Sequence, residues 1–331
     1  MFSKNKVETP WAYRQKIFIT GGAGFIGKAL IDKLYPHHDI VIYSRDESKH
    51  YYLKKQFHNV KCVVGDVSDY DSMARAAYGC HRGIYAASMK QIEACDENPL
   101  QAARTIMLGA INSRNVTDEM KMVSGTFVST DKSRAATTVY GALKFAAGES
   151  FILNADEEMG SSPQLSTLIY GNVLNSTGSI IPLIWKSIEA KRPLTLYGED
   201  MTRFMITKDE AVRLIMASPY YHAVNLIPQI PSFKVIDLFE IYAEKFGLQY
   251  EVGTPRVGEK IHEVMIAQEE VPRTHLSKHV GFPLYVLQPK GDSTSDSPTF
   301  PNNEFSSRDS VLTRSQLSHI LEGHGFFLPV R

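Results

Sequence analysis

A short apolar stretch followed by three evenly spaced glycines constrains this chain more than any other feature. The β-rich run Lys16–Thr20 leads directly into Gly21, Gly24 and Gly27, and a helical pattern of apolar residues follows over residues 29–34. A strand, a glycine turn and a helix in this order suit a pyrophosphate, because glycines let the backbone approach the phosphates and the helix amino end supplies free N–H groups. The stretch therefore predicts a nucleotide-binding α/β unit.

Further apolar runs predict the rest of a sheet. They cover residues 40–43, 60–64, 83–87, 122–128 and 165–170. The chain has 331 residues, 43% of them hydrophobic, which suits one large α/β domain with a substantial appendage, or two closely joined domains.

Three polar residues follow the predicted strand that ends at residue 128. Thr130, Asp131 and Lys132 fall just past its carboxyl end, and in open α/β sheets ligands bind at that edge. An acid and an amine placed there could transfer protons to or from a ligand. As an isolated pair, Asp131 and Lys132 would be an ordinary solvated turn.

A tyrosine and a lysine follow one loop later. Tyr140 and Lys144 lie four residues apart in a segment with a helical pattern, so both side chains share one helix face. A lysine ammonium beside a phenol favours the phenolate, and we therefore expect the pKa of Tyr140 to lie below its usual value of about 10. Together with Thr130, Asp131 and Lys132, this pair forms the candidate catalytic group.

The glycine spacing after Thr20 and the Tyr140–Lys144 pair resemble the extended short-chain dehydrogenase/reductase family. Within that family, the chain is similar over most of its length to the inverting UDP-N-acetylglucosamine 4,6-dehydratases of polysaccharide and flagellin-sugar biosynthesis. The discriminating feature is the pair Asp131–Lys132, since 4-epimerases place small hydroxyl residues there and retaining dehydratases usually have Asp-Glu. The resemblance implies a Rossmann fold, with a doubly wound parallel sheet and a smaller C-terminal substrate-binding region, and a nicotinamide cofactor.

Residues after the second and third predicted strands bear on the choice of cofactor. Ser44 and Arg45 suit the 2′-phosphate of NADP, whereas an acidic residue there would bind the ribose diol of NAD, so NADP is favoured over NAD. Asp66 resembles the adenine-contacting turn of the family; a turn that caps a helix from Asp69 is the alternative. The resemblance implies cofactor contacts from Thr20, Gly21, Gly24, Phe25, Ile26, Gly27, Ser44, Arg45, Asp66, Val67, Ala86, Ala87, Tyr140, Lys144, Tyr170 and Asn172.

The same resemblance implies a UDP-sugar substrate and a role for each catalytic residue. Tyr140, assisted by Lys144, takes the O4 proton while hydride leaves C4. Lys132, with a pKa lowered by burial, removes the C5 proton, and protonated Asp131 helps the C6 hydroxyl leave as water. Hydride then returns to C6 and a proton to C5. The implied substrate-binding residues are Lys90, Asn172, Arg203, Arg256 and Glu259, of which Arg203 and Arg256 are expected to be loop cations that contact a diphosphate.

The chain departs from the family pattern at two positions. Ile106 stands where the family usually has Asn, and Ile169 where it usually has Arg before Tyr-Gly-Asn-Val. Three alternatives therefore stay open: a UDP-sugar 4-epimerase, a UDP-glucose dehydratase, and a protein that binds NADP and UDP-sugar without turnover.

Overall charge and composition bound the partners and the location. Lys plus Arg and Asp plus Glu both number 36, so a formal net charge of zero gives no global case for nucleic acid or an anionic membrane. The three cysteines match neither metal-ligand nor redox spacing, and we expect no metal. The start lacks the apolar core of a secretion signal and no run is long enough to span a membrane, which predicts the cytoplasm. By resemblance, the assembly is expected to be a homo-oligomer, a dimer or a hexamer.

The sequence predicts two regions. Residues 1–173 form an NADP-binding Rossmann domain to which 203–228 return, and residues 174–331 form the substrate-binding region with a C-terminal arm. The segment Gly291–Ser310 is rich in polar residues and proline, which predicts a long loop or an ordered arm. A short closing helix is expected over residues 312–321.

Overall fold

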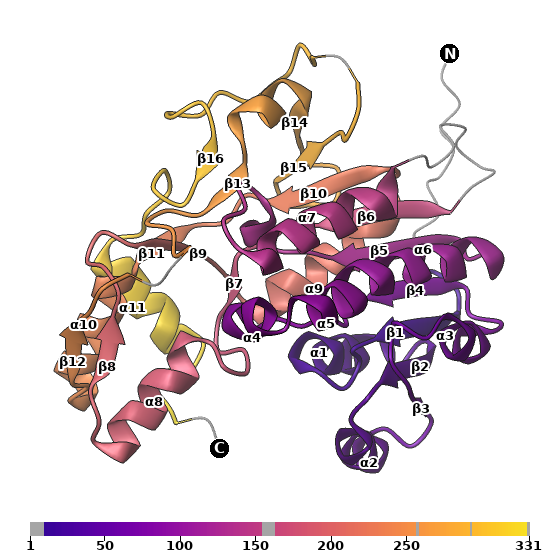
Figure 1. Ribbon diagram of the computed structural model, residues 1–331, viewed down its shortest axis with the longest axis horizontal. Helices are drawn as coiled ribbons and strands as arrows, with labels where there is room; N and C mark the ends of the chain where they lie inside the picture. The colour runs from indigo at the N-terminus through magenta and orange to yellow at the C-terminus, as the bar shows by residue number, and fades with distance from the viewer. Residues whose placement is uncertain (1–9, 154–162, 256–257, 292, 330–331) are drawn as a thin grey trace.

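A computed structural model describes residues 10–153, 163–255, 258–291 and 293–329 of the chain. Its centre is a nine-stranded sheet with a second, smaller lobe beside it (Figure 1). Seven neighbouring strands run parallel, in the order β3-β2-β1-β4-β5-β6-β10. They are β1 (Lys16–Thr20), β2 (Asp39–Ser44), β3 (Lys61–Val64), β4 (Arg82–Tyr85), β5 (Ser124–Val128), β6 (Gln164–Leu168) and β10 (Val224–Pro228).

The strand order confirms the predicted Rossmann fold, because 3-2-1-4-5-6 is the order of dinucleotide-binding α/β sheets. An antiparallel pair, β15 (Leu284–Leu287) and β14 (Thr274–Ser277), extends the sheet beyond β10. The return of the chain to the sheet by residue 228 was expected. In contrast, the sequence division placed residues 274–287 in the C-terminal region, whereas they pair with the main sheet.

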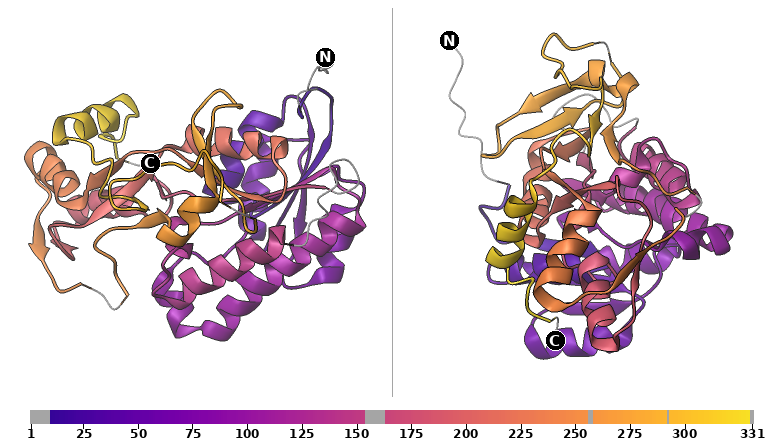
Figure 2. Two further views of the ribbon diagram at one scale, coloured as in Figure 1. Left: turned by 90° about the horizontal axis from the view of Figure 1, so that it is seen from above. Right: turned by 90° about the vertical axis from the view of Figure 1, so that its left-hand side faces the viewer.

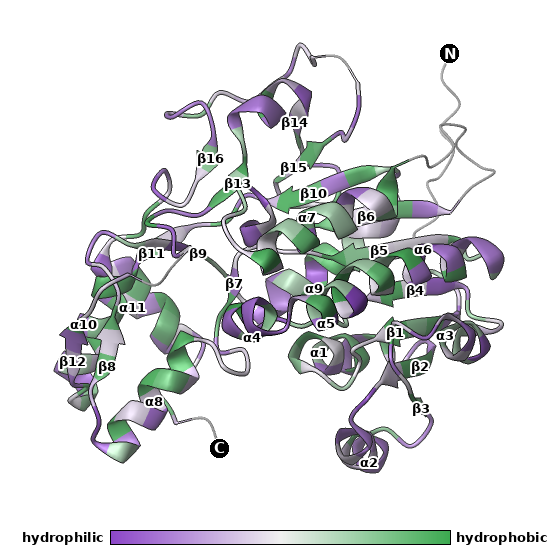
Figure 3. Cartoon of the chain, viewed as in Figure 1, coloured by the Kyte–Doolittle hydropathy of each residue, from purple (hydrophilic) through white to green (hydrophobic). Residues whose placement is uncertain are grey.

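Helices cover both faces of the sheet (Figure 2). One face carries α3, α5, α6 and α7, and the other carries α1 and α9. Strands β1, β4 and β5 lie in the middle of the sheet and are buried on both faces. Hydrophobic colouring therefore runs along them in Figure 3. The helices of this part are α1 (Phe25–Leu34), α2 (Glu47–Gln56), α3 (Tyr70–Ala77), α4 (Ile92–Glu97), α5 (Pro99–Ala103), η1 (Arg104–Leu108), α6 (Gly109–Glu119), η2 (Asp131–Ser133), α7 (Val139–Ile152), α9 (Lys208–Ala217) and η3 (Ser218–Tyr220).

The predicted glycine turn joins β1 to α1. Gly21 has φ +68°, and a Cβ there would lie 2.9 Å from the backbone nitrogen of Ala87. At Gly27, a Cβ would lie 2.5 Å from the Cα of Gly22, which is closer than any side chain tolerates. The two glycines therefore allow the β1–α1 turn to pack against the end of β4 and α1 to pack against the turn.

The smaller lobe has its own hydrophobic core. Trp185 of α8 packs edge-on against Tyr242 and at a tilt against Phe246 of α10, with ring centroids 5.6 and 4.9 Å away. Two short strands, β8 and β12, pair in parallel at its edge. The elements of this lobe are α8 (Ile180–Ala190), β8 (Leu194–Leu196), α10 (Val235–Phe246), β12 (Tyr250–Val252) and α11 (Arg314–Gly323).

Short strands and a long segment connect the lobe to the sheet. The segment predicted as a loop or an arm is ordered where it is described, because Phe300 and Phe305 are buried against Tyr285 of β15. The connecting elements are β7 (Asn172–Val173), β9 (Thr202–Ile206), β11 (Ser232–Lys234), β13 (Val264–Ile266), η4 (Gln268–Arg273) and β16 (Phe305–Ser306).

Candidate active site

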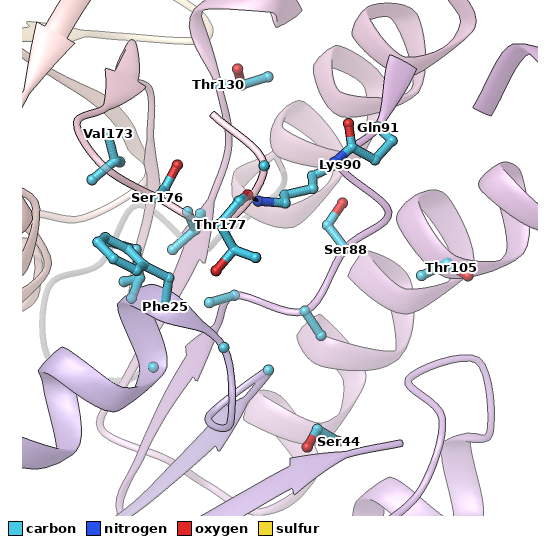
Figure 4. Close-up of a pocket in the computed structure, with 18 of the residues that line it drawn as sticks. Phe25, Ser44, Ser88, Lys90, Gln91, Thr105, Thr130, Val173, Ser176 and Thr177 are labelled. Carbon is cyan, nitrogen blue, oxygen red and sulfur yellow. Dashed lines mark hydrogen bonds between the residues drawn. The ribbon is translucent and has the colours of Figure 1, made fainter. Parts of the chain in front are cut away.

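A cavity of about 920 Å³ lies along the carboxyl ends of the parallel strands (Figure 4). Many of the predicted site residues line it, although they come from segments up to 151 positions apart, from Gly21 to Asn172. These are Gly21, Gly24, Phe25, Ile26, Gly27, Ser44, Arg45, Asp66, Val67, Ala86, Ala87, Lys90, Thr130, Lys132, Tyr140, Lys144, Tyr170 and Asn172.

The remaining predicted residues take other positions. Thr20 is buried behind the cavity wall, where its hydroxyl accepts a hydrogen bond of 3.2 Å from the backbone nitrogen of Ala87. Asp131 is buried beneath Lys132. Arg203 and Glu259 pair with each other outside the cavity lining. Arg256 lies outside the described residues.

One end of the cavity fits a nucleotide cofactor. The amino end of α1, capped by Gly24 without a side-chain hydrogen bond, borders the cavity and supplies the free N–H groups that a pyrophosphate requires. Asp66 receives two hydrogen bonds from Ser68, and its backbone oxygen receives one from Tyr43. Asp69 caps α3, as the alternative interpretation of this turn expected, and an adenine contact by Asp66 stays a prediction.

The residues after β2 carry positive charge into the cavity. The Arg45 side chain is 61% exposed and lies 3.7 Å from Asp66 Oδ2. The Ser44 hydroxyl lies 2.7 Å from His50 Nε2. Lys49 also lines this end and pairs with Asp46 at 2.8 Å. Two exposed cations and a hydroxyl form a suitable setting for a phosphate monoester.

Tyr140 and Lys144 occupy one face of α7, whose start is capped by Thr138. The expected lowering of the Tyr140 pKa is wrong for this structure: burial raises the pKa of Tyr140 to about 12, although the Lys132 charge and a hydrogen bond with Thr130 oppose the rise. Lys144 Nζ donates instead to the Val128 carbonyl, at 2.6 Å, on β5. Burial also lowers the pKa of Lys144 to about 7, so its charge is small above that pH.

Asp131 and Lys132 form part of a buried charge cluster. Lys132 Nζ lies 3.1 Å from Asp131 Oδ1, 3.3 Å from Glu263 Oε1 and 3.3 Å from Asn172 Oδ1. The Asp131 side chain is 1% exposed and Lys132 is 23% exposed. Thr130 donates a hydrogen bond of 3.0 Å to Asp131 Oδ1.

The pKa of Lys132 in this cluster differs from the prediction, whereas the pKa of Asp131 agrees with it. Burial acts to lower the pKa of Lys132, but Asp131 and Glu263 reverse this effect and raise the pKa above its usual value, so the expected lowering is wrong. Burial raises the pKa of Asp131 and the repulsion from Glu263 adds to the rise, against the attraction of Lys132. A protonated Asp131, as expected for an acid, agrees with this direction.

Arg203 does not lie in a loop, contrary to prediction. It belongs to β9, its side chain is 9% exposed, and it donates 2.6 and 2.7 Å hydrogen bonds to Glu259 Oε1 and the Thr202 carbonyl. The loop that precedes β13 wraps around the guanidinium because the Thr202 backbone nitrogen donates to the Ile261 carbonyl. A role in substrate binding stays a prediction for Arg203 and Glu259.

The two departures from the family pattern are core residues. Ile106 is 2% exposed within η1, a π-helical turn between α5 and α6, and Ile169 is 1% exposed after β6. The wider turn directs Thr105 to the cavity wall (Figure 4). Sequence reasoning did not single out Thr105, because a π-helical turn has no local sequence pattern.

Two further residues were not candidates in the sequence analysis: Thr177, which lines the cavity, and Glu263, which is buried beside Lys132. Lys90 donates a hydrogen bond to the Thr177 carbonyl across the cavity mouth (Figure 4), so the loops after β4 and β7 meet there. Glu263 was part of the family-like stretch 258–263, but its carboxylate was not a candidate. Only the pairing of that stretch with β9 brings it to Lys132.

A protein-family model described as "Polysaccharide biosynthesis protein" matches residues 17–282. The chain belongs to this family. The resemblance predicted from the glycine turn, the Asp-Lys pair and the Tyr-Lys pair is thereby confirmed.

Two of the relatives differ in their named activities. The "UDP-N-acetylglucosamine 4,6-dehydratase (inverting)" of Campylobacter jejuni subsp. jejuni serotype O:2 is 32% identical over 79% of this chain and 80% of its own length. The "UDP-glucose 4-epimerase" of Rickettsia massiliae is 30% identical over 78% and 79%. The crystal structure of Pen from Bacillus thuringiensis, 24% identical, has the same fold with a TM-score of 0.85 over 95% of this chain and 99% of that one.

Within the described residues, no helix is both long enough and apolar enough to cross a bilayer.

Proposed function

We propose that this member of the polysaccharide biosynthesis family is an NADP-dependent UDP-N-acetylglucosamine 4,6-dehydratase, a hydro-lyase that inverts C5. Its product would be a UDP-2-acetamido-2,6-dideoxy-4-hexulose. The observation that carries the proposal is Asp131, which is 1% exposed and lies 3.1 Å from Lys132 beside the cavity that Tyr140 lines. Epimerisation at C4 needs no acid of this kind, whereas loss of the C6 hydroxyl does.

Each of the proposed catalytic residues then has one role. Tyr140 takes the proton of the O4 hydroxyl. A nicotinamide held in the cavity would supply the hydride chemistry between C4 and C6. Lys132 removes the C5 proton. Because its side chain is still 23% exposed, a bound sugar would complete its burial, and burial favours the neutral amine. Protonated Asp131 gives its proton to the departing C6 hydroxyl.

The remaining predicted contacts support the same ligands. We assign the α1 end of the cavity to the pyrophosphate of the cofactor, and Lys90 and Asn172, on the opposite wall, to the UDP-sugar. The cytoplasmic location stays a prediction from sequence. We also expect a homo-oligomer, in agreement with the partly exposed apolar residues Leu100 and Ile111 on α5 and α6 and Phe145 on α7.

The decisive experiment is proton NMR of the protein with UDP-GlcNAc and NADP in deuterated water. We expect a new C6 methyl signal with deuterium at C5, and product couplings that show inversion. A C4 epimer without the methyl signal would show a 4-epimerase instead. Vinyl protons would show elimination without the final reduction. If UDP-glucose reacts and UDP-GlcNAc does not, the proposed substrate is wrong. If no sugar nucleotide reacts while NADP is bound, the chain only binds these ligands.

Arg45 provides a test of the cofactor choice. Replacing Arg45 by Ala removes a cation that is 61% exposed at the end of β2, and we expect the affinity for NADP to fall about 10- to 100-fold while that for NAD changes little. Calorimetric titration measures both. Arg14→Ala is the matched control, because Arg14 is equally exposed but pairs with Asp39 at the amino end of β2. A wild-type protein that prefers NAD, or an unchanged NADP affinity in the variant, would contradict the assignment.

A further inference from the structure

Glu263 is a buried carboxylate that the proposed mechanism does not use. It precedes β13, and its side chain is 4% exposed. Its Oε1 lies 3.3 Å from Lys132 Nζ and 3.9 Å from Arg203 Nε, and its Oε2 lies 3.6 Å from Lys260 Nζ. A carboxylate at this depth is stable as an anion only when cations surround it, and three do.

Asp131 lies on the other side of Lys132 in a different environment. Its Oδ1 contacts Thr130 and Lys132, but its buried Oδ2 has neither a hydrogen bond nor an ion pair among the described residues. Glu263 Oε2 also has no hydrogen-bond partner, but Lys260 Nζ lies 3.6 Å from it. A buried, unpartnered oxygen disfavours the ionised carboxylate. The two carboxylates thus compete for one ammonium, and Arg203 and Lys260 favour the charge on Glu263.

We propose that Glu263 is a positioning residue: as the counter-ion of Lys132, it leaves Asp131 free to hold the proton that the C6 hydroxyl takes when it leaves. This charge distribution is that of the sugar-free protein and does not depend on the proposed function. Its catalytic meaning rests on that function, in which Lys132 loses its ammonium proton when the bound sugar completes its burial. Without Glu263, Asp131 would be the counter-ion of Lys132 and would enter the reaction as an ionised carboxylate, which cannot act as an acid.

The pKa directions agree with this division of charge. Burial raises the pKa of Asp131, and the negative charge of Glu263 raises it further. Burial acts in the same sense on Glu263, but Lys132, Arg203 and Lys260 together hold its pKa below the usual range. Two other titratable groups face the cluster. Tyr140 of α7 is neutral with a raised pKa, and Glu259 pairs with Arg203 at 2.6 Å.

Infrared difference spectra of the sugar-free protein test the inference. The spectrum of the wild type minus that of Asp131→Asn isolates the Asp131 carboxyl, and we expect the band of a protonated carboxyl at about pH 7. The same subtraction in the Glu263→Gln background is expected to show an ionised carboxylate at that pH. In that background, the pH at which the band of the protonated Asp131 carboxyl reappears should be lower than in the wild type by about one unit or more, because a repelling charge has been removed.

Glu259→Gln is the matched control for this spectrum. It removes a carboxylate from the same loop, but one that pairs with Arg203 and not with Lys132, so the Asp131 band is expected to remain. If Glu263→Gln does not fold, Glu263→Asp, which keeps the charge but withdraws it, is expected to shift the titration of Asp131 in the same direction by less. An ionised Asp131 in the wild type, an unchanged band in the Glu263 variants, or equal shifts in Glu259→Gln would overturn the inference.

The pH profile of dehydration is a second readout. Loss of the acid limits the rate at high pH, and we expect that limb to move to lower pH by about one unit in Glu263→Gln. A variant that was only less stable would lower the rate without moving the limb. If no sugar reacts, the proposed function fails, but the spectra still decide which carboxylate carries the charge.

Discussion

Replacing Tyr140 by Phe is expected to lower the rate of dehydration by about 10²- to 10⁴-fold, the usual contribution of a positioned general base. The ring, which is 7% exposed, would still fill its place in α7, so folding and NADP binding should change little. Only the hydroxyl that takes the O4 proton is lost. The NMR assay with UDP-GlcNAc measures the rate, and titration measures NADP binding.

The pH dependence gives this prediction a second test. Burial raises the pKa of Tyr140 to about 12, so the phenolate fraction, and with it the rate of C4 oxidation, should rise with pH in the wild type. Tyr140→Phe should lose that rise. Tyr78→Phe is the control, because Tyr78 is 76% exposed after α3. A Tyr140→Phe enzyme with more than about a tenth of the wild-type rate would assign the base to another group.

Replacing Asp131 by Asn is expected to stop dehydration without stopping the earlier steps. The amide keeps the shape of the side chain but has no acidic proton for the C6 hydroxyl, so methyl formation should fall about 10²- to 10⁴-fold. Tyr140 and Lys132 remain, and the 4-ketone should still form and exchange its C5 proton. Recovered UDP-GlcNAc should therefore carry deuterium at C5 when the reaction is run in deuterated water.

Lys132→Met is the matched comparison for this experiment. It removes the base at C5, so we expect neither methyl formation nor deuterium at C5. The two variants together separate the acid from the base, although Asp131 and Lys132 are in contact. Dehydration by Asp131→Asn within about tenfold of the wild type, or C5 exchange by Lys132→Met, would show that the roles are wrongly assigned.

The sequence anticipated the parts of the site that depend on local pattern. The turn at Gly21, the strand ends at Ser44 and Asp66 and the helix face of Tyr140 all border the predicted cavity. Each of these predictions rests on a short stretch in which the residue types alone set the backbone path or the strand end. The edge of a parallel sheet then brings the stretches together, because all its strands end on one side.

Charge states were harder to predict. The lowered pKa expected for Lys132 assumed burial alone, but Glu263, which lies 131 positions later in the chain, holds the ammonium at 3.3 Å. The lowered pKa expected for Tyr140 assumed a nearby ammonium, but Lys144 reaches the Val128 carbonyl instead. Helical spacing determines the face of the helix on which a side chain lies, but it does not determine the group with which that side chain forms a hydrogen bond.

Sequence alone therefore determined the Rossmann sheet, the sheet edge along which the cavity lies and the identity of the groups able to transfer protons. These follow from glycine spacing, apolar runs and strand ends, which act over a few residues. Only the tertiary structure decided that Glu263 lies beside Lys132, that Arg203 is buried in β9 and that β14 and β15 extend the sheet. These depend on contacts between distant segments, where the balance of burial and charge is set by neighbours that no local pattern specifies.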